Sequence, residues 1–134
     1  MDRIIGIDFG RKRIGLAVSD PLIVFASALE TVPSAKIIDY IKNYAQKETI
    51  IRFVVGYPKN MNNTIGPRGE ASENYARLLT ETYGFPVTLW DERLTTMAAE
   101  RMLIDADVSR KKRKTVIDKM AAVMILQGYL DSKN

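Results

Sequence analysis

Three strand-like segments open this chain, and the links between them are too short to hold a helix. The segments are residues 3–8, 13–19 and 27–32, with turn residues at Gly10-Arg11-Lys12 and Asp20-Pro21 between them. Strands joined by such short links pair antiparallel, because a parallel connection needs about a dozen residues or more. The sequence therefore predicts an antiparallel three-stranded meander.

Helical and strand-like segments alternate through the rest of the chain. Ser34 is expected to cap a first helix, and residues 50–56 are typical of a strand covered on both faces. A long loop is expected over 57–69, then a helix over about 70–83, a fifth strand over 87–91 and a last helix over about 115–130. Thr95 or Thr96 is expected to cap a further helix that ends near Ile104.

The predicted helices each carry an apolar face. The first helix is expected to bury Ile37, Ile38, Ile41, Tyr44 and Ala45, and the second Ala71, Tyr75, Leu78 and Leu79. Helical crossovers imply parallel neighbouring strands. We therefore predict an α/β fold with a mixed five-stranded sheet flanked by helices, in which strands 1 to 3 are antiparallel and strands 4 and 5 are added in parallel. At 134 residues, the chain 1–134 is expected to form one domain.

Composition narrows the chemistry that is open to the chain. It has no cysteine and no histidine, which excludes disulfides, thiolate zinc sites and the commonest general base. The formal net charge of +4 favours anionic partners modestly. Because no apolar run could span a bilayer and no signal-peptide pattern is present, a cytoplasmic location is expected.

Three acidic residues occupy positions that folding alone explains poorly. Asp8 closes the first apolar strand, Glu92 follows the fifth strand, and Asp118 lies within an apolar helical segment. Buried charges are costly unless they are paired or bind a metal ion. Structural alternatives remain open: Asp8 could start a turn with Gly10, Glu92 could be a surface charge at a helix start, and Asp118 could favour the first turn of its helix.

If the three carboxylates meet, they would suit two Mg²⁺ or Mn²⁺ ions at a phosphodiester, because hard cations prefer oxygen ligands. Two basic groups flank them, and the five-residue run that precedes the last predicted helix opposes the helix macrodipole. A phosphate backbone would relieve that penalty, although a solvated loop is an alternative. The candidate nucleic-acid-binding residues are Arg11, Lys12, Arg13, Lys59, Asn60, Arg93, Arg110, Lys111, Lys112, Arg113 and Lys114.

Several motifs taken together resemble the YqgF family, whose members are described as pre-16S rRNA nucleases and Holliday-junction resolvases. The motifs are Gly6-Ile7-Asp8-Phe9-Gly10, Arg13-Ile14-Gly15-Leu16-Ala17, Gly56-Tyr57-Pro58, Asp91-Glu92-Arg93-Leu94-Thr95-Thr96 and Ile117-Asp118-Lys119-Met120-Ala121-Ala122. The resemblance implies an RNase H-like fold and a catalytic set of Asp8, Glu92 and Asp118. It also implies cleavage of structured nucleic acid, with 5′-end maturation of pre-16S rRNA favoured and resolution of four-way DNA junctions as the alternative.

One loop departs from the family pattern, since residues 60–64 read Asn-Met-Asn-Asn-Thr where Asn-Met-Asp-Gly-Thr is usual. Three other interpretations stay open: a ribosomal RNA-binding module without catalysis, an actin-like ATPase whose phosphate loop resembles residues 6–10, and a nuclease fold whose acids are structural. The ATPase would need two such domains, and the chain supplies one. The oligomeric state stays open between a monomer and a weak dimer.

Overall fold

The predicted sheet is present, with strands in the order β3-β2-β1-β4-β5. The structure is a computed structural model that describes residues 1–60, 62–93 and 101–133, and for residues 117–119 it describes the backbone alone. The strands are β1 (Asp2–Asp8), β2 (Arg13–Ser19), β3 (Ala26–Pro33), β4 (Thr49–Tyr57) and β5 (Val87–Asp91). β1 pairs antiparallel with β2 and parallel with β4, β2 pairs antiparallel with β3, and β4 pairs parallel with β5. The mixed sheet is therefore confirmed.

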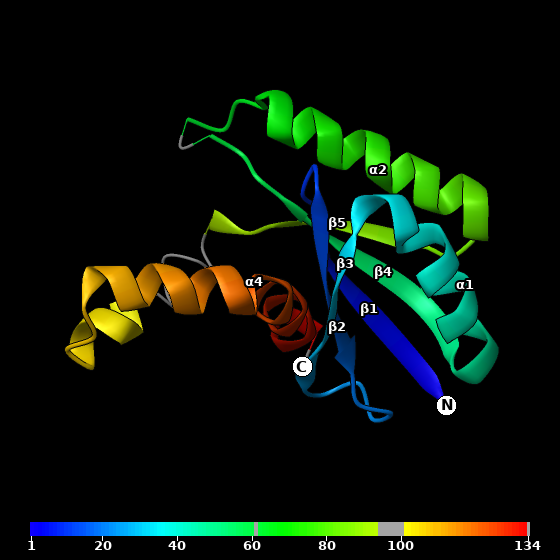
Figure 1. Ribbon diagram of the computed structural model, residues 1–134, viewed down its shortest axis with the longest axis horizontal. Coiled ribbons are helices and arrows are strands. Elements are labelled where there is room, and N and C mark those ends of the chain that lie inside the picture. Colours follow the sequence, from blue (N-terminus) through cyan, green and yellow to red (C-terminus); the bar gives the residue numbers. More distant parts are fainter. Residues whose placement is uncertain (61, 94–100, 134) are drawn as a thin grey trace.

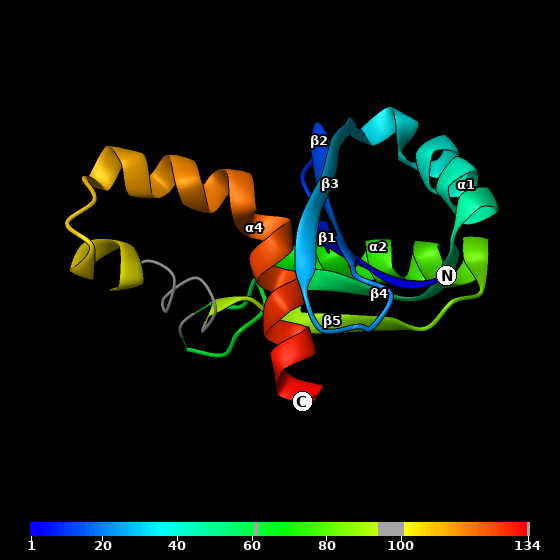
Figure 2. The ribbon, with the colours of Figure 1, turned by 90° about the horizontal axis from the view of Figure 1, so that it is seen from below.

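Helices cover both faces of this sheet (Figures 1 and 2). A short 3-10 turn, η1 (Ser34–Lys36), leads into α1 (Ile37–Lys47), and α1 and α2 (Pro67–Tyr83) cover one face. α4 (Arg110–Lys133) crosses the other face through its C-terminal half. No helix in the described part of the chain is long and apolar enough to cross a membrane.

Alternate residues of the central strands supply two separate cores. Ile5 and Ile7 of β1 and Phe53 of β4 pack beneath α1 and α2, whereas Ile4 and Val54 pack beneath α4. Strands that are covered on both faces read as nearly continuous apolar runs, which is why residues 50–56 were recognisable in the sequence. The α4 core consists of Ala122, Ile125, Leu126, Tyr129 and Leu130, together with the strand residues that they cover.

The predictions for α1 and α2 need correction. Ser34 does not cap α1, because its hydroxyl donates to the carbonyls of Gly10 and Arg11 and so ties the β1–β2 loop to η1. Ile37 and Ile41 are buried as expected, but Ile38 and Ala45 are exposed. α2 begins at Pro67, since proline suits the first helical position, and the predicted loop is shorter at both ends than expected.

The buried face of α2 is also rotated from the prediction. Ser72, Tyr75, Ala76 and Leu79 are buried, whereas Leu78 is exposed and Ala71 is half-buried. The helix ends as predicted at Gly84, which adopts a left-handed conformation with φ of 75°.

The beginning of α4 was also predicted wrongly. The helix starts at Arg110, because Ser109 accepts the amides of Lys112 and Arg113 through its side-chain and main-chain oxygens. The basic run therefore forms the first turns of the helix and does not precede it. Position 118 consequently lies in the third turn, which removes first-turn capping as an explanation for Asp118. Thr95 and Thr96 lie outside the described residues, and residues 101–105 are helical.

Candidate active site

Asp8 and Glu92 lie at the same edge of the sheet, on either side of the end of β4. Asp8 is the last residue of β1, and Glu92 directly follows β5. Ile7 pairs with Val55 and Gly56 pairs with Trp90, so the register places Gly56 between the two acids. The backbones of β1 and β5 are two strand spacings apart, about 9.6 Å. The side chains of Asp8 and Glu92 can bring their carboxylates closer together than this backbone distance.

Glycine at position 56 leaves the space into which one of these carboxylates projects. A Cβ atom at Gly56 would lie 2.5 Å from Oε2 of Glu92 and 2.5 Å from Cδ1 of Ile125 on α4. Gly15 on β2 leaves similar room beside the other acid, because its Cβ would lie 3.6 Å from Cβ of Asp8 and 3.8 Å from Cβ of Ala122. The small residues thus form a cradle around the acids, which explains glycines inside strands.

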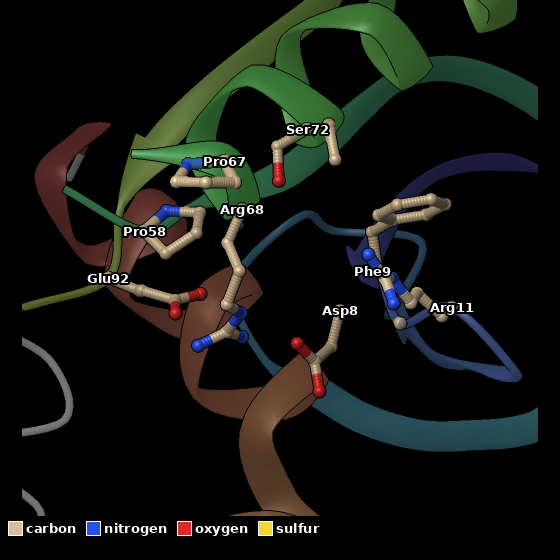
Figure 3. Close-up of a pocket in the computed structure, with 11 residues that line it drawn as sticks. Asp8, Phe9, Arg11, Pro58, Pro67, Arg68, Ser72 and Glu92 are labelled. Carbon is tan, nitrogen blue, oxygen red and sulfur yellow. The ribbon is translucent and has the colours of Figure 1, made fainter. Parts of the chain in front are cut away.

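A cavity of about 160 Å³ opens between the two acids and the start of α2. Figure 3 shows the Asp8 and Glu92 carboxylates facing this space, with Arg68 approaching from α2. The walls come from the ends of β1, β4 and β5 and from the first turns of α2. The lining residues are Asp8, Phe9, Gly10, Arg11, Gly56, Pro58, Pro67, Arg68, Ala71, Ser72 and Glu92.

The electrostatics distinguish Glu92 from its neighbour Asp91. Burial raises the pKa of Glu92, and the nearby negative charge of Asp8 raises it further, while Arg68 partly offsets both effects. In contrast, hydrogen bonds from Arg93 hold the pKa of Asp91 below its usual value. Asp91 is therefore a structural acid with a partner, whereas Glu92 is an acid that the fold holds near another acid. Perturbed carboxylates of that kind are typical of functional sites.

Arg68 is a pocket residue that the sequence analysis missed. It lies in the first turn of α2, directly after Pro67, and its charge acts on Glu92. Apolar periodicity carries no information about such a residue. The signal that could have found it is Gly66-Pro67, which marks a helix start and so places the next side chain at the edge of the sheet where β4 ends.

The side chain of Asp118, the third predicted acid, lies outside the described part of the chain. Its backbone position lies one turn before Ala122, whose methyl group is close to Gly15 and lines a second hollow beside Asp8. Among the described side chains, no three acids lie close enough to hold a metal ion together. The structure thus brings Asp8 and Glu92 into one pocket.

Arg93 makes contacts within the chain that the sequence does not reveal. Its guanidinium donates to both carboxylate oxygens of Asp91, to the carbonyl of Asn60 and to Oδ1 of Asn63. Asn63 has φ of 69°, a left-handed conformation that explains why glycine is usual at this place in the family pattern. Arg93 therefore fastens the 58–65 loop to the end of β5, next to Glu92.

The other predicted nucleic-acid-binding residues lie in three places. Arg11 lines the pocket, and Lys12 and Arg13 are exposed beside it. In the 58–65 loop, the Asn60 side chain donates to Thr64, and the Lys59 ammonium lies 5.6 Å from the centre of the Tyr57 ring. In α4, Arg113 donates to the carbonyl of Val108, and four cations are exposed: Arg110, Lys111, Lys112 and Lys114.

The sheet order, the two covered faces and the acids at one edge define an RNase H-like α/β fold. A solved structure described as Thermus thermophilus RuvC in complex with a Holliday junction substrate has the same fold, with a TM-score of 0.62 and 15% identity over 99% of this chain and 96% of that one. A family model described as "RuvX: Holliday junction resolvase" matches residues 2–132. The chain belongs to this family.

Close relatives in sequence agree with that assignment. A protein of Bacillus subtilis named "Putative pre-16S rRNA nuclease" is 57% identical over 98% of this chain and 99% of its own length. A protein of Listeria innocua with the same name is 58% identical, again over 98% of this chain and 99% of its own length. The resemblance that the motifs indicated is therefore confirmed.

Proposed function

We propose that this chain, as one domain over residues 1–134, is a divalent-metal-dependent endonuclease that cleaves structured RNA, with 5′-end maturation of pre-16S rRNA as its task. The observation that carries the proposal is the meeting of Asp8 and Glu92 in one pocket across the unobstructed Gly56. Two carboxylates held close together at this edge are costly for folding, and a bound divalent cation would offset that cost. The names of the relatives support the choice of RNA.

The residues fit Mg²⁺ or Mn²⁺. The donors are carboxylate oxygens, and the chain has neither the cysteine nor the histidine that softer metals prefer. Asp8 and Glu92 would hold the metal, and Asp118 is the proposed third ligand, because its backbone lies one helical turn before Ala122, which lines the hollow beside Asp8. When bound, two such ions would supply charge stabilisation at the phosphate and activation of the attacking water.

The basic residues would bind the substrate so that its scissile phosphate lies at the acidic pocket. Lys111, Lys112 and Lys114 are exposed on the first half of α4, which stands away from the sheet (Figures 1 and 2). Arg11 lies at the pocket itself. A helix lined with cations and separated from the pocket would contact the phosphate backbone beyond the cleavage point, which suits a structured substrate longer than a few nucleotides.

The proposal is tested by removing the charge of one acid at a time. Asp8→Asn, Glu92→Gln and Asp118→Asn are each expected to lower metal-dependent cleavage of a pre-16S rRNA fragment by at least about 10³-fold, because metal ligands supply several kcal/mol of transition-state stabilisation. Glu70→Gln is the matched control, since Glu70 is an exposed acid in the first turn of α2 outside the pocket. Wild-type cleavage rates in folded Asp8→Asn or Glu92→Gln protein would refute the proposal.

A four-way DNA junction is the second candidate substrate, and the description of the matching family favours it. The same enzyme preparation should be given the rRNA fragment and a four-way junction at equal concentration with Mg²⁺ and with Mn²⁺. Cleavage of the junction alone would replace RNA by branched DNA in the proposal. Salt-sensitive RNA binding with no cleavage of either substrate would favour a binding module instead.

A further inference from the structure

The position of Arg68 is unfavourable for the helix that carries it. The residue lies in the first turn of α2, where the helix macrodipole favours negative charge and disfavours a cation. Glu70, in the same turn, has the favourable sign. Arg68 therefore does not stabilise α2 through the helix macrodipole, and its role is to be found in the groups that its guanidinium faces.

Arg68 faces the two acids of the candidate active site. Figure 3 shows its guanidinium directed into the pocket between the Glu92 and Asp8 carboxylates. It is close enough to Glu92 for its charge to act on that carboxylate. Among the described residues Arg68 forms no ion pair with Glu92, so the guanidinium acts on that carboxylate without being locked to it.

We propose that Arg68 is the counter-cation of the Asp8–Glu92 pair until divalent ions bind, and a ligand of the substrate phosphate afterwards. This inference rests on the proposed metal-dependent nuclease function and adds a residue to its site. In the metal-free protein, one guanidinium offsets part of the repulsion between two carboxylates. Divalent ions bring more positive charge to the same place, which turns the attraction on Arg68 into repulsion.

A phosphate group then gives Arg68 a new partner. The guanidinium fork matches two phosphate oxygens, and the side chain is long enough to turn from the acids toward a substrate in the same pocket. The Arg68 residue is exposed, so no packing has to be broken for this movement. Arg68 would thus oppose metal binding and favour substrate binding, and these two effects can be measured separately.

The experiment compares Arg68→Gln with Arg77→Gln. Arg77 is an exposed arginine on the same helix, about 13 Å further along its axis, and its replacement changes the net charge equally. Mn²⁺ affinity is measured by electron paramagnetic resonance without RNA, and cleavage of the rRNA fragment is measured at saturating Mn²⁺. For Arg68→Gln we expect Mn²⁺ to bind several-fold more tightly and cleavage to slow by about 10- to 100-fold. For Arg77→Gln both quantities should stay within about twofold of wild type.

Arg68→Lys separates charge from shape. It keeps the positive charge and should bind Mn²⁺ nearly as wild type, but cleavage should fall because the ammonium lacks the two-pronged fork. Unchanged or weaker Mn²⁺ binding by Arg68→Gln overturns the counter-cation role, and unchanged cleavage overturns the phosphate role. If the wild type binds no Mn²⁺, or if Asp8→Asn and Glu92→Gln bind it as wild type does, the proposed function itself fails.

Discussion

Replacing Gly56 by alanine puts a methyl group where the Glu92 carboxylate lies. The new Cβ would be 2.5 Å from Oε2 of Glu92 and from Cδ1 of Ile125, whereas ordinary contact begins at 3.4 Å. Each atom must therefore retreat by roughly 0.9 Å, the difference between these two distances. Both are ends of flexible side chains, so the fold should survive with a loss of about 1 to 3 kcal/mol.

Function should suffer much more than folding. A displacement of about 1 Å in a group that positions the reaction costs on the order of 10²-fold in rate. We therefore expect Gly56→Ala to cleave the rRNA fragment about 100-fold more slowly and to bind Mn²⁺ more weakly, with unchanged affinity for RNA. Single-turnover kinetics, electron paramagnetic resonance and salt-controlled RNA titrations measure these three quantities.

Gly66→Ala is the matched control for this substitution. It adds the same methyl group close to the pocket, at the residue that precedes α2, and its nearest atom would be Nδ2 of Asn60 at an ordinary 3.6 Å. Cleavage by this variant should stay within a few-fold of wild type. If folded Gly56→Ala protein matches the Gly66→Ala control in rate and in Mn²⁺ affinity, the position of Glu92 beside Gly56 does not govern activity.

Three further predictions follow from charges in the structure. The folded protein raises the pKa of the Glu92 carboxyl above 4.5, so the folded state binds the carboxyl proton more tightly than the unfolded chain does. The contribution of this proton to folding stability is full below pH 4.5 and is lost as pH rises through the folded-state pKa. Metal-free Glu92→Gln should therefore melt at a higher temperature than wild type at pH 7, and equal melting at pH 7 would contradict this. The exposed lysines of α4 are Lys111, Lys112 and Lys114. Replacing all three by glutamine should reduce the salt slope of RNA binding by about 2 to 3, with little change in the cleavage rate of bound substrate. An unchanged slope would remove α4 from the RNA interface. Hydrogen bonds from the backbone amides of Phe25, Val24 and Leu22 hold the pKa of Asp20 below 3.8. Asp20→Ala should therefore speed hydrogen exchange at these three amides. In the wild type, acid should weaken their protection only as pH falls through the lowered pKa of Asp20.

The strands could be predicted closely from the sequence, because their signal is local. β2 and β5 have the predicted bounds, and β4 differs by one residue at each end. Apolar runs between turn residues suffice when both faces of a strand are buried. Helix ends were harder, because a helix start depends on which oxygen accepts the first amides. Ser109 supplies those oxygens for α4, so a run of five cations begins the helix despite the macrodipole.

The candidate site could be predicted only in part, for a reason that lies in its construction. Asp8 and Glu92 end or follow strands that run parallel, and the ends of parallel strands meet at one edge, so sequence order was enough to bring them together. Arg68 reaches the same pocket from a helix, and its approach depends on how α2 packs over the sheet, which no local pattern encodes. The contacts of Arg93 with Asn60 and Asp91 likewise join segments that are distant in the chain or lie beyond a strand end, and the sequence around Arg93 does not encode them. Sequence order therefore predicted that Asp8 and Glu92 share one edge of the sheet, while the contacts of the two arginines depend on elements that are distant in the chain.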